Sequence, residues 1–249
     1  MSQPSDNGRS PLLNVEAVDA FYGEMQVLRQ ASLQVRRGEV VAIFGPNGHG
    51  KSTLMKNIAG LCRPTAGKIM LEAVDISGWP CEKIVETGVA LIPEDRLLFP
   101  HMSVMDNLIC GAVNKNARPH FKSNLKKVFD LFPRLAERTS QLANSLSGGE
   151  ARMLAVGRGM MSHADLLLVD EPSVGLSPLM KQGVFDAIAT LRDEGRVGIL
   201  VVEQEVDYGL AVADRIYVMT KGRILFERTA AEAKREEIER AYFRSEKEQ

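Results

Sequence analysis

The fold is decided by the stretch Gly45-Pro46-Asn47-Gly48-His49-Gly50-Lys51-Ser52-Thr53, which satisfies the phosphate-loop pattern G-x-x-x-x-G-K-[ST] in full. Its glycines let the backbone approach phosphate oxygens with no Cβ in the way. We expect Lys51 to reach the β- and γ-phosphates of a nucleotide and the Ser52 hydroxyl to ligate Mg²⁺. The alternative interpretation is an ordinary glycine-rich turn.

The segments on either side of this loop favour the phosphate site. Glu39–Phe44 is apolar and β-branched, which predicts a buried strand, and Leu54–Gly60 predicts a helix that ends at its glycine. A strand, a glycine loop and a helix in this order aim successive backbone N–H groups and the positive end of the helix at one anion. We therefore predict a nucleotide-binding α/β domain.

Length and composition set the bounds of the prediction. The chain has 249 residues, which suits one large domain or a core with a small subdomain, and its net charge is −1, so nothing points to nucleic acid. Cys62, Cys81 and Cys110 are scattered and odd in number, which disfavours a disulfide framework. Residues 1–11 are polar, which predicts a disordered tail rather than a signal peptide. No apolar run approaches the ~18–20 residues of a membrane span, so we expect a soluble chain that meets a membrane only through partners.

Around the loop, the pattern predicts a mostly parallel core sheet with an antiparallel β layer before it and a helical insertion after it. The expected strands of the antiparallel layer are Leu12–Ala20 and Ala31–Val35, and the insertion spans about Met102–Gln141. Tyr22 follows the first strand, where its ring either stacks on a purine or stays half-buried in the sheet. Glu94 follows the buried strand Val89–Ile92, so it either approaches the phosphates or lies in an exposed turn.

Two later segments carry further chemistry. Leu146-Ser147-Gly148-Gly149-Glu150 opens a helix over Ala151–Met161 and forms a second anion-binding helix start, useful for a nucleotide held by another subunit. The strand Asp165–Val169 is followed by Asp170 and Glu171, which either cap the strand end or serve the site. In the second case Asp170 holds Mg²⁺ through water, and Glu171 orients and polarises an attacking water.

In this order and spacing, the three motifs resemble those of the ATP-binding cassette (ABC) family over about residues 12–230. The resemblance implies one ABC ATPase domain over residues 12–249. Its expected α/β fold is a phosphate-loop cassette with a mostly parallel core sheet, an N-terminal antiparallel β layer and a helical subdomain inserted at about 95–160. Within the family, the chain is similar to the ATPase subunit of branched-chain (hydrophobic) amino acid importers. The segments that carry this similarity are Pro93-Glu94-Asp95-Arg96, Ser147–Glu150, Asp170–Pro178 and Val202-Glu203-Gln204.

The resemblance also implies roles for individual residues. Tyr22 occupies the adenine-stacking position, and Ser147, Gly148, Gly149 and Glu150 are placed to contact the γ-phosphate of ATP in the opposing subunit. Ser52, Glu94 and Asp170 form the Mg²⁺ site, while Glu171 and Gln204 occupy the catalytic glutamate and switch positions.

Three positions depart from the general family pattern: Glu94 replaces glutamine, Gln204 replaces histidine and Ser177 replaces aspartate. Gln204 cannot become cationic. The loss of one charge-assisted contact costs about 1–3 kcal/mol, or roughly ten- to a hundredfold in rate, so we expect slow turnover.

The implied assembly is an ATP-hydrolysing importer subunit on the inner face of a bacterial cell membrane. Its expected partners are two permease subunits, a second ATPase subunit of the same or a sister chain, and indirectly a periplasmic or extracellular substrate-binding protein. The alternatives are the same subunit type for urea, amides or aromatic acids, a weakly hydrolysing regulatory cassette, and a stand-alone cassette acting on DNA or ribosomes. We disfavour the last because the chain carries no second cassette, long coiled coil or basic arm.

Overall fold

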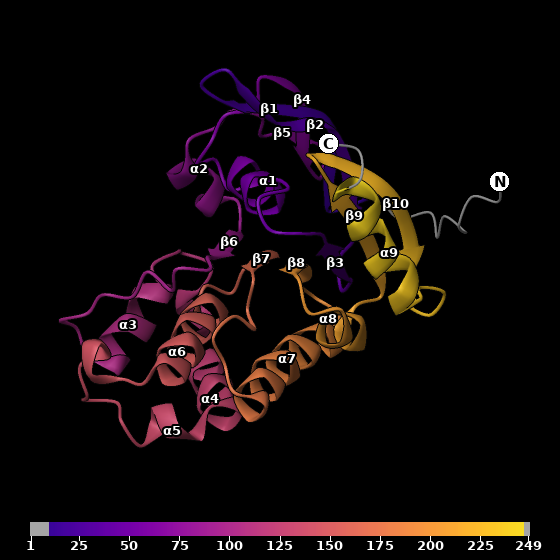
Figure 1. The fold of residues 1–249 in the computed structure, drawn as a ribbon. Helices are drawn as coiled ribbons and strands as arrows, with labels where there is room; N and C mark the ends of the chain where they lie inside the picture. Colours follow the sequence, from indigo (N-terminus) through magenta and orange to yellow (C-terminus); the bar gives the residue numbers. More distant parts are fainter. Residues whose placement is uncertain (1–9, 247–249) are drawn as a thin grey trace.

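Two β-sheets and a set of helices form this chain, as seen in a computed structural model that describes residues 10–246 (Figure 1). The expected tail, 1–11, lies outside the described residues except for Ser10 and Pro11. The strands are β1 (Leu13–Tyr22), β2 (Met25–Val35), β3 (Val40–Phe44), β4 (Ala66–Leu71), β5 (Val74–Asp75), β6 (Val89–Ile92), β7 (Leu166–Asp170), β8 (Gly198–Glu203), β9 (Arg215–Thr220) and β10 (Arg223–Thr229).

The helices lie between these strands. They are α1 (Lys51–Ile58), α2 (Cys81–Glu86), α3 (Val104–Gly111), α4 (Phe121–Leu131), α5 (Pro133–Ala136), α6 (Gly148–Met161), α7 (Pro178–Asp193), α8 (Val206–Val212) and α9 (Arg235–Glu246), with 3-10 turns η1 (Arg118–His120) and η2 (Ala143–Ser145). The C-terminal helix α9 begins at Arg235, and residues 247–249 lie outside the described part of the chain. Within this described part, no helix combines the length and apolar character needed to cross a membrane.

The core sheet has the strand order β10-β9-β3-β8-β7-β6, and every neighbouring pair is parallel except β10 with β9. This confirms the predicted mostly parallel sheet. In a parallel sheet the carboxyl ends of strands lie at one edge, so the segments that follow β3, β6, β7 and β8 converge there. These segments carry the phosphate loop, Glu94, Glu171 and Gln204.

The predicted antiparallel layer is a four-stranded sheet of order β2-β1-β4-β5. Its first two strands form a longer hairpin than expected, because β1 runs to Tyr22 and β2 begins at Met25. The pairing of β1 and β2 has irregular register, and Ala17 and Gln30 adopt positive φ angles of 46° and 50°. Such bulges interrupt the two-residue alternation from which strand length is predicted.

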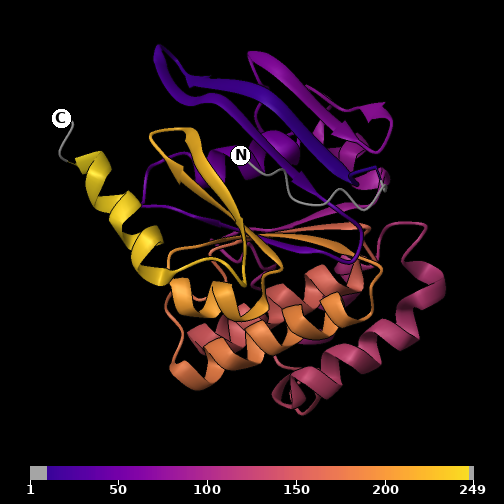
Figure 2. The same ribbon diagram turned by 90° about the vertical axis from the view of Figure 1, so that its right-hand side faces the viewer.

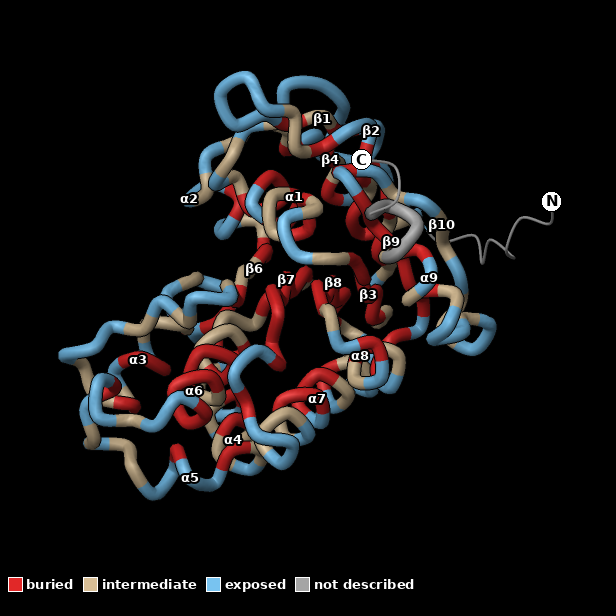
Figure 3. The backbone as a smooth tube through the Cα atoms, in the orientation of Figure 1, coloured by how far each residue is buried: buried red, intermediate tan, exposed pale blue. Residues whose placement is uncertain are grey.

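The two faces of the core sheet are covered differently (Figure 2). One face carries α1 and the antiparallel sheet, and the other carries α6, α7 and α8, with α3 and α4 packed against α6. Side chains of β7 alternate between these faces: Leu166 and Leu168 belong to the first core cluster, Leu167 and Val169 to the second. The strands β3, β7, β8 and β9 are therefore buried on both sides, as Figure 3 shows by colour, whereas the edge strand β10 is partly exposed.

The helical insertion contains α3, α4 and α5 and is closed by α6, although its expected boundaries of about 95–160 remain a prediction. Ser103 begins α3 with a capping box in which its hydroxyl accepts from the Asp106 N–H at 3.0 Å. Val104 and Leu108 from α3 and Val128 from α4 pack on α6 in the second core cluster. This packing fixes α6, whose first residues carry the second anion-binding motif.

Candidate functional site

The phosphate loop lies between β3 and α1, as predicted. Helix α1 begins at Lys51, three residues earlier than expected, because Gly50 forms its N-cap with a φ of 99° that only glycine adopts readily. A Cβ at Gly45 would lie 2.2 Å from the Met219 carbonyl oxygen of β9, so the loop also passes too close to the neighbouring strand for a side chain. The loop thus leads directly into the N-terminus of α1, where the free N–H groups of a helix favour an anion.

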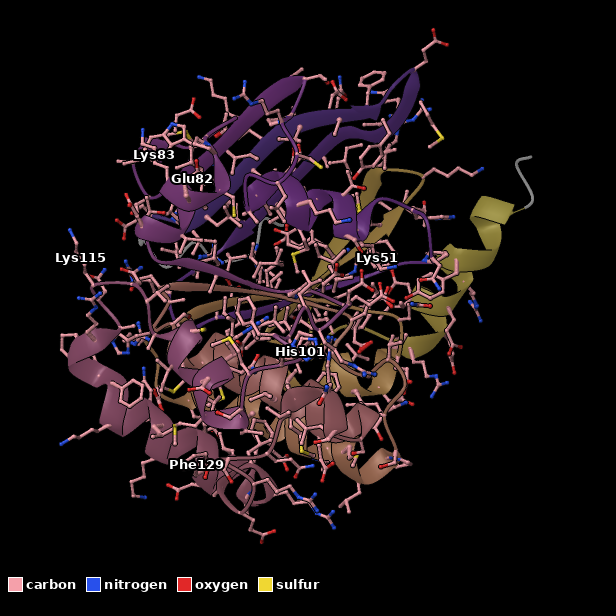
Figure 4. The ribbon with its side chains drawn as sticks, turned by 90° about the vertical axis from the view of Figure 1, so that its left-hand side faces the viewer. Lys51, Glu82, Lys83, His101, Lys115 and Phe129 are labelled. Carbon is pink, nitrogen blue, oxygen red and sulfur yellow. The ribbon has the colours of Figure 1, made fainter. Side chains whose placement is uncertain are left out.

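Lys51 is almost completely buried, with 3% of its surface exposed. Its ammonium group donates to the carbonyl oxygens of Gly45 at 2.7 Å and Pro46 at 2.9 Å, and lies 3.6 Å from a carboxylate oxygen of Glu171. Burial lowers the pKa of Lys51, and the nearby Glu171 opposes that shift. Figure 4 labels Lys51 where α1 meets the core sheet. The cation is thus held in place by the loop itself, ready for an anion.

Ser52 and Asp170 meet across the site. The Ser52 hydroxyl donates to an Asp170 carboxylate oxygen at 3.1 Å, and this pair of hard oxygen ligands fits Mg²⁺. Asp170 ends the buried strand β7, and burial raises its pKa to about 6 although the Ser52 hydrogen bond opposes the shift. A raised carboxyl pKa means that the buried charge is costly unless a cation compensates it.

Replacing Asp170 by asparagine is expected to stabilise the metal-free chain above pH 6. The wild-type carboxyl titrates near 3.8 when unfolded and about 6 when folded, so its charge destabilises the fold progressively as the pH rises through this window. We expect Asp170→Asn to raise the free energy of unfolding by about 3 kcal/mol at pH 7.5, and by less at pH 4.5. Urea unfolding in EDTA at both pH values measures the two free energies of unfolding. An equal gain in stability at both pH values would contradict the raised pKa of Asp170. The control is Asp186→Asn, since Asp186 is exposed.

Glu171 follows Asp170 and is 5% exposed. Its φ is 46°, in the left-handed region that non-glycine residues seldom adopt. One carboxylate oxygen accepts a 2.6 Å hydrogen bond from the side-chain amide of Gln204, which follows β8. Gln204 is held in turn because its N–H donates to the buried Glu203 carboxylate at 2.9 Å. The two predicted catalytic residues are therefore in direct contact.

A pocket of about 270 Å³ joins the predicted phosphate and catalytic residues. It is lined by Asn47, Gly48, Gly50, Lys51, Ser52, Thr53, Glu94 and Glu171. Its walls thus come from three segments that are far apart in the sequence: the phosphate loop, the loop after β6 and the end of β7. Cationic, amide and hydroxyl donors of the phosphate loop lie opposite two carboxylates, an arrangement suited to a triphosphate with a bound cation.

Other predicted site residues lie outside this pocket. Gly45 and Pro46 supply the carbonyl oxygens that hold Lys51. The His49 ring accepts a hydrogen bond from the Lys221 N–H at 3.3 Å, which ties the loop to the β9–β10 turn. Tyr22 is 46% exposed at the end of β1, and its hydroxyl lies 3.6 Å from Cys62 Sγ.

The segment Ser147–Glu150 forms the start of α6 rather than a wall of the pocket. Ser147 and Glu150 make a capping box, in which the Glu150 carboxylate accepts from the Ser147 N–H at 2.9 Å and from its hydroxyl at 2.8 Å. These hydrogen bonds lower the pKa of Glu150, so its charge is committed to the cap. Ser147 and Gly148 are exposed and open to another molecule.

Two buried residues of the site escaped sequence analysis. Glu203 accepts from the Ser173 N–H and hydroxyl as well as from Gln204, and it fixes the loop that follows Glu171. Arg152 of α6 donates to carbonyl oxygens on either side of the site, including those of Asp170 and Glu171. Glu203 lies in the segment Val202-Glu203-Gln204, but neither its partner Ser173 nor the partners of Arg152 are close in the sequence, so these contacts are visible only in the fold.

A phosphate loop between a parallel strand and a helix, with acids at the end of the neighbouring strands, defines a phosphate-loop nucleotide hydrolase. The ABC transporter family model matches residues 28–174. The chain therefore belongs to the ABC transporter family, as its ATPase cassette.

Relatives and solved structures agree with this assignment. The high-affinity branched-chain amino acid transport ATP-binding protein BraG of Pseudomonas aeruginosa is 40% identical over 88% of this chain and 94% of its own length. The probable branched-chain amino acid transport ATP-binding protein LivF of Archaeoglobus fulgidus is 34% identical over 89% and 93%. A crystal structure of an ABC transporter cassette in its ADP conformation aligns with a TM-score of 0.75 and 27% identity, over 93% of this chain and 94% of that one.

Proposed function

We propose that this cassette powers the import of branched-chain or other hydrophobic amino acids, as a peripheral subunit on the cytoplasmic face of a bacterial cell membrane. The observation that carries the proposal is the pocket shared by the phosphate loop, Glu94 and Glu171, in a chain similar to ATP-binding proteins of branched-chain amino acid transport. Importers of urea, amides or aromatic acids are the alternative within the same subunit type.

The working unit is a head-to-tail dimer with this chain or a sister cassette. Ser147 and Gly148 are exposed at the start of α6, away from the pocket of their own chain. Val174 (44%) in the loop after β7 and Leu179 (83%) in the first turn of α7 are exposed apolar side chains that suit a contact between subunits. Each ATP would lie between the Lys51 loop of one cassette and the Ser147–Glu150 segment of the other, with its adenine on Tyr22.

Hydrolysis uses the residues that already meet in the pocket. Lys51 exchanges its contacts with Gly45, Pro46 and Glu171 for the β- and γ-phosphates. Glu171, freed from Lys51 and oriented by Gln204, positions a water molecule and accepts its proton as the water attacks the γ-phosphorus. The bond from the γ-phosphorus to the bridging oxygen breaks, and ADP and inorganic phosphate are the products. Mg²⁺ held by Ser52, Asp170 and Glu94 would neutralise part of the phosphate charge.

A second pocket offers a docking site for the permease subunits. It has a volume of about 270 Å³ and lies between α2 and β6 of the core and α3 and α6 of the helical insertion. Val85, Phe99 and Val113 expose apolar side chains along it. Arg158, also in its wall, donates to the carbonyl oxygens of Leu97 at 2.7 Å and Arg96 at 3.1 Å, in the loop that begins with Glu94. Movement of a partner in this pocket would therefore reach the ATP site.

A charge in this second pocket is expected to separate assembly from nucleotide binding. Val113 is 64% exposed, so Val113→Glu should fold normally but place a carboxylate where a permease helix would bury apolar surface. We expect co-purification with the co-expressed permeases to be lost while ATP binding by the isolated chain persists. Val74→Glu on β5, equally an exposed valine but in the antiparallel sheet, is the matched control and should assemble.

Reconstitution tests the proposed function as a whole. The chain, its permeases and its partner cassette are placed in lipid vesicles with the substrate-binding protein, and ATP turnover is followed as leucine, urea or an aromatic acid is added. We expect leucine to stimulate turnover most. Stimulation only by urea or an aromatic acid would assign a different cargo. If the wild-type chain supports ATP turnover only when a more active sister cassette is present, this chain is the regulatory cassette. Gln204 in place of the switch histidine is the feature that favours this alternative.

A further inference from the structure

Arg152 is the largest of the side chains that are almost fully buried, with 2% of its surface exposed. It lies on α6, one turn after the Ser147 cap. Its Nε donates to Pro172 at 3.2 Å, its Nη1 to Pro93 at 2.8 Å and Glu94 at 3.0 Å, and its Nη2 to Asp170 at 2.7 Å and Glu171 at 2.6 Å. Every one of these acceptors is a main-chain carbonyl oxygen.

These acceptors belong to two separate loops of the site. Pro93 and Glu94 follow β6, whereas Asp170 ends β7 and Glu171 and Pro172 follow it. Helix α6 packs on β6, and Arg152 reaches from it to the segment at the end of β7. The planar guanidinium carries five N–H donors in a fixed fork, so one side chain can bond both loops at once in a way that a lysine ammonium cannot. A buried cation is costly unless its donors are satisfied, and here the carbonyl oxygens satisfy them.

The geometry of Glu171 gives this contact a purpose. A φ of 46° at a glutamate is strained by about 1–3 kcal/mol, so surrounding contacts have to maintain it. The turn directs the carbonyl oxygens of three successive residues, 170–172, toward Arg152. It also directs the Glu171 carboxylate toward Gln204 and Lys51. In this backbone conformation, the carbonyl oxygens of residues 170–172 accept from Arg152, while the Glu171 side chain contacts Gln204 and Lys51.

We propose that Arg152 is a positioning residue for ATP hydrolysis, which holds the backbone of Glu171 and of the Glu94 loop in the geometry that hydrolysis requires. This inference rests on the proposed role of Glu171. Because Arg152 is part of α6, it also joins the pocket of its own chain to the exposed start of α6 at Ser147 and Gly148, which would face the other ATP in the proposed dimer. Arg152 does not itself line the phosphate pocket, so we expect its substitution to change turnover more than ATP affinity.

The test compares Arg152→Lys and Arg152→Gln with the wild-type chain. We expect kcat for ATP to fall roughly 10- to 100-fold, because displacing a catalytic group by about 1 Å has an effect of this size, whereas the KM for ATP and the affinity for a fluorescent ATP analogue should stay within about threefold. Arg192→Lys is the matched control, since Arg192 of α7 also donates to a main-chain carbonyl oxygen, that of Val212, away from the site. Thermal unfolding verifies that each variant is folded.

A double-mutant cycle shows whether the effect passes through Glu171. If Arg152 acts by placing Glu171, then adding Arg152→Lys to Glu171→Gln should lower the residual turnover by less than about twofold. Additive losses of turnover in the double mutant would overturn the inference, and so would an unchanged kcat in the single Arg152 variants. Failure of both Arg152 variants to fold would also overturn it, because Arg152 would then serve folding rather than catalysis. The proposed function fails separately, when the wild-type chain does not hydrolyse ATP or Glu171→Gln leaves its rate unchanged.

Discussion

Lys51→Ala is expected to weaken ATP binding roughly 30- to 1000-fold and to reduce hydrolysis to background, because a desolvated charge pair contributes about 2–4 kcal/mol. The ammonium group is buried, and the loop carbonyl oxygens of Gly45 and Pro46 already fix its position. It can therefore meet the β- and γ-phosphates without a large rearrangement. Equilibrium titration with MgATP and steady-state ATP turnover measure the two effects.

Lys56→Ala is the control for this experiment. Lys56 lies in the last turn of the same helix, α1, but its side chain is exposed, so its removal should change neither binding nor turnover. Removing Lys51 also takes the nearest cation from Glu171, so thermal unfolding should accompany the assay. A folded Lys51→Ala variant with normal turnover would show that the glycine loop does not bind the hydrolysed nucleotide.

The parts of the site that could be predicted from sequence depend on local chemistry at strand ends. The phosphate loop, Glu94 and Glu171 each follow an apolar strand directly, and parallel strands bring such segments to one edge of the sheet. The pocket that these segments share follows from the order of elements. No contact between distant side chains had to be known.

The remaining features depend on contacts between residues far apart in the sequence or on local irregularities, and the periodicity of apolar residues predicts neither. The hairpin of β1 and β2 is longer than predicted because its bulges at Ala17 and Gln30 interrupt the alternation. Arg152 reads as one polar residue on a helix, yet its partners are 18–20 and 58–59 residues away. The carboxylate of Glu150 caps α6, and the exposed part of this segment is its start at Ser147 and Gly148. The contact of Ser147–Glu150 with ATP of another subunit stays a prediction.

The departures from the family pattern acquire a physical meaning in the pocket. Gln204 has no charge, but its amide donates to Glu171 over 2.6 Å, so this contact can orient the carboxylate without a proton on the switch residue. Glu94 lines the same pocket and adds a second carboxylate near Glu171. Glu94 and Asp170 together favour a bound divalent cation, since unneutralised they would repel the phosphates.

Glu171→Gln is expected to lower ATP turnover about 10²- to 10⁴-fold, the usual range for a lost general base, while ATP binding remains. The substitution keeps the shape of the side chain, and its amide oxygen can still accept from Gln204, but it can no longer take a proton. The substitution also removes the carboxylate that lies 3.6 Å from the Lys51 ammonium group. Lys51 can then bind the triphosphate without first giving up its ion pair with Glu171. The variant should therefore accumulate as an ATP-bound dimer, detectable as a shift in size-exclusion elution with MgATP.

Glu205→Gln is the control for this experiment, because Glu205 is an exposed acid paired with Lys181, and the variant should elute as the wild type does. Normal hydrolysis by Glu171→Gln would mean that another group activates the water, and the strained turn at Glu171 would then need a different explanation.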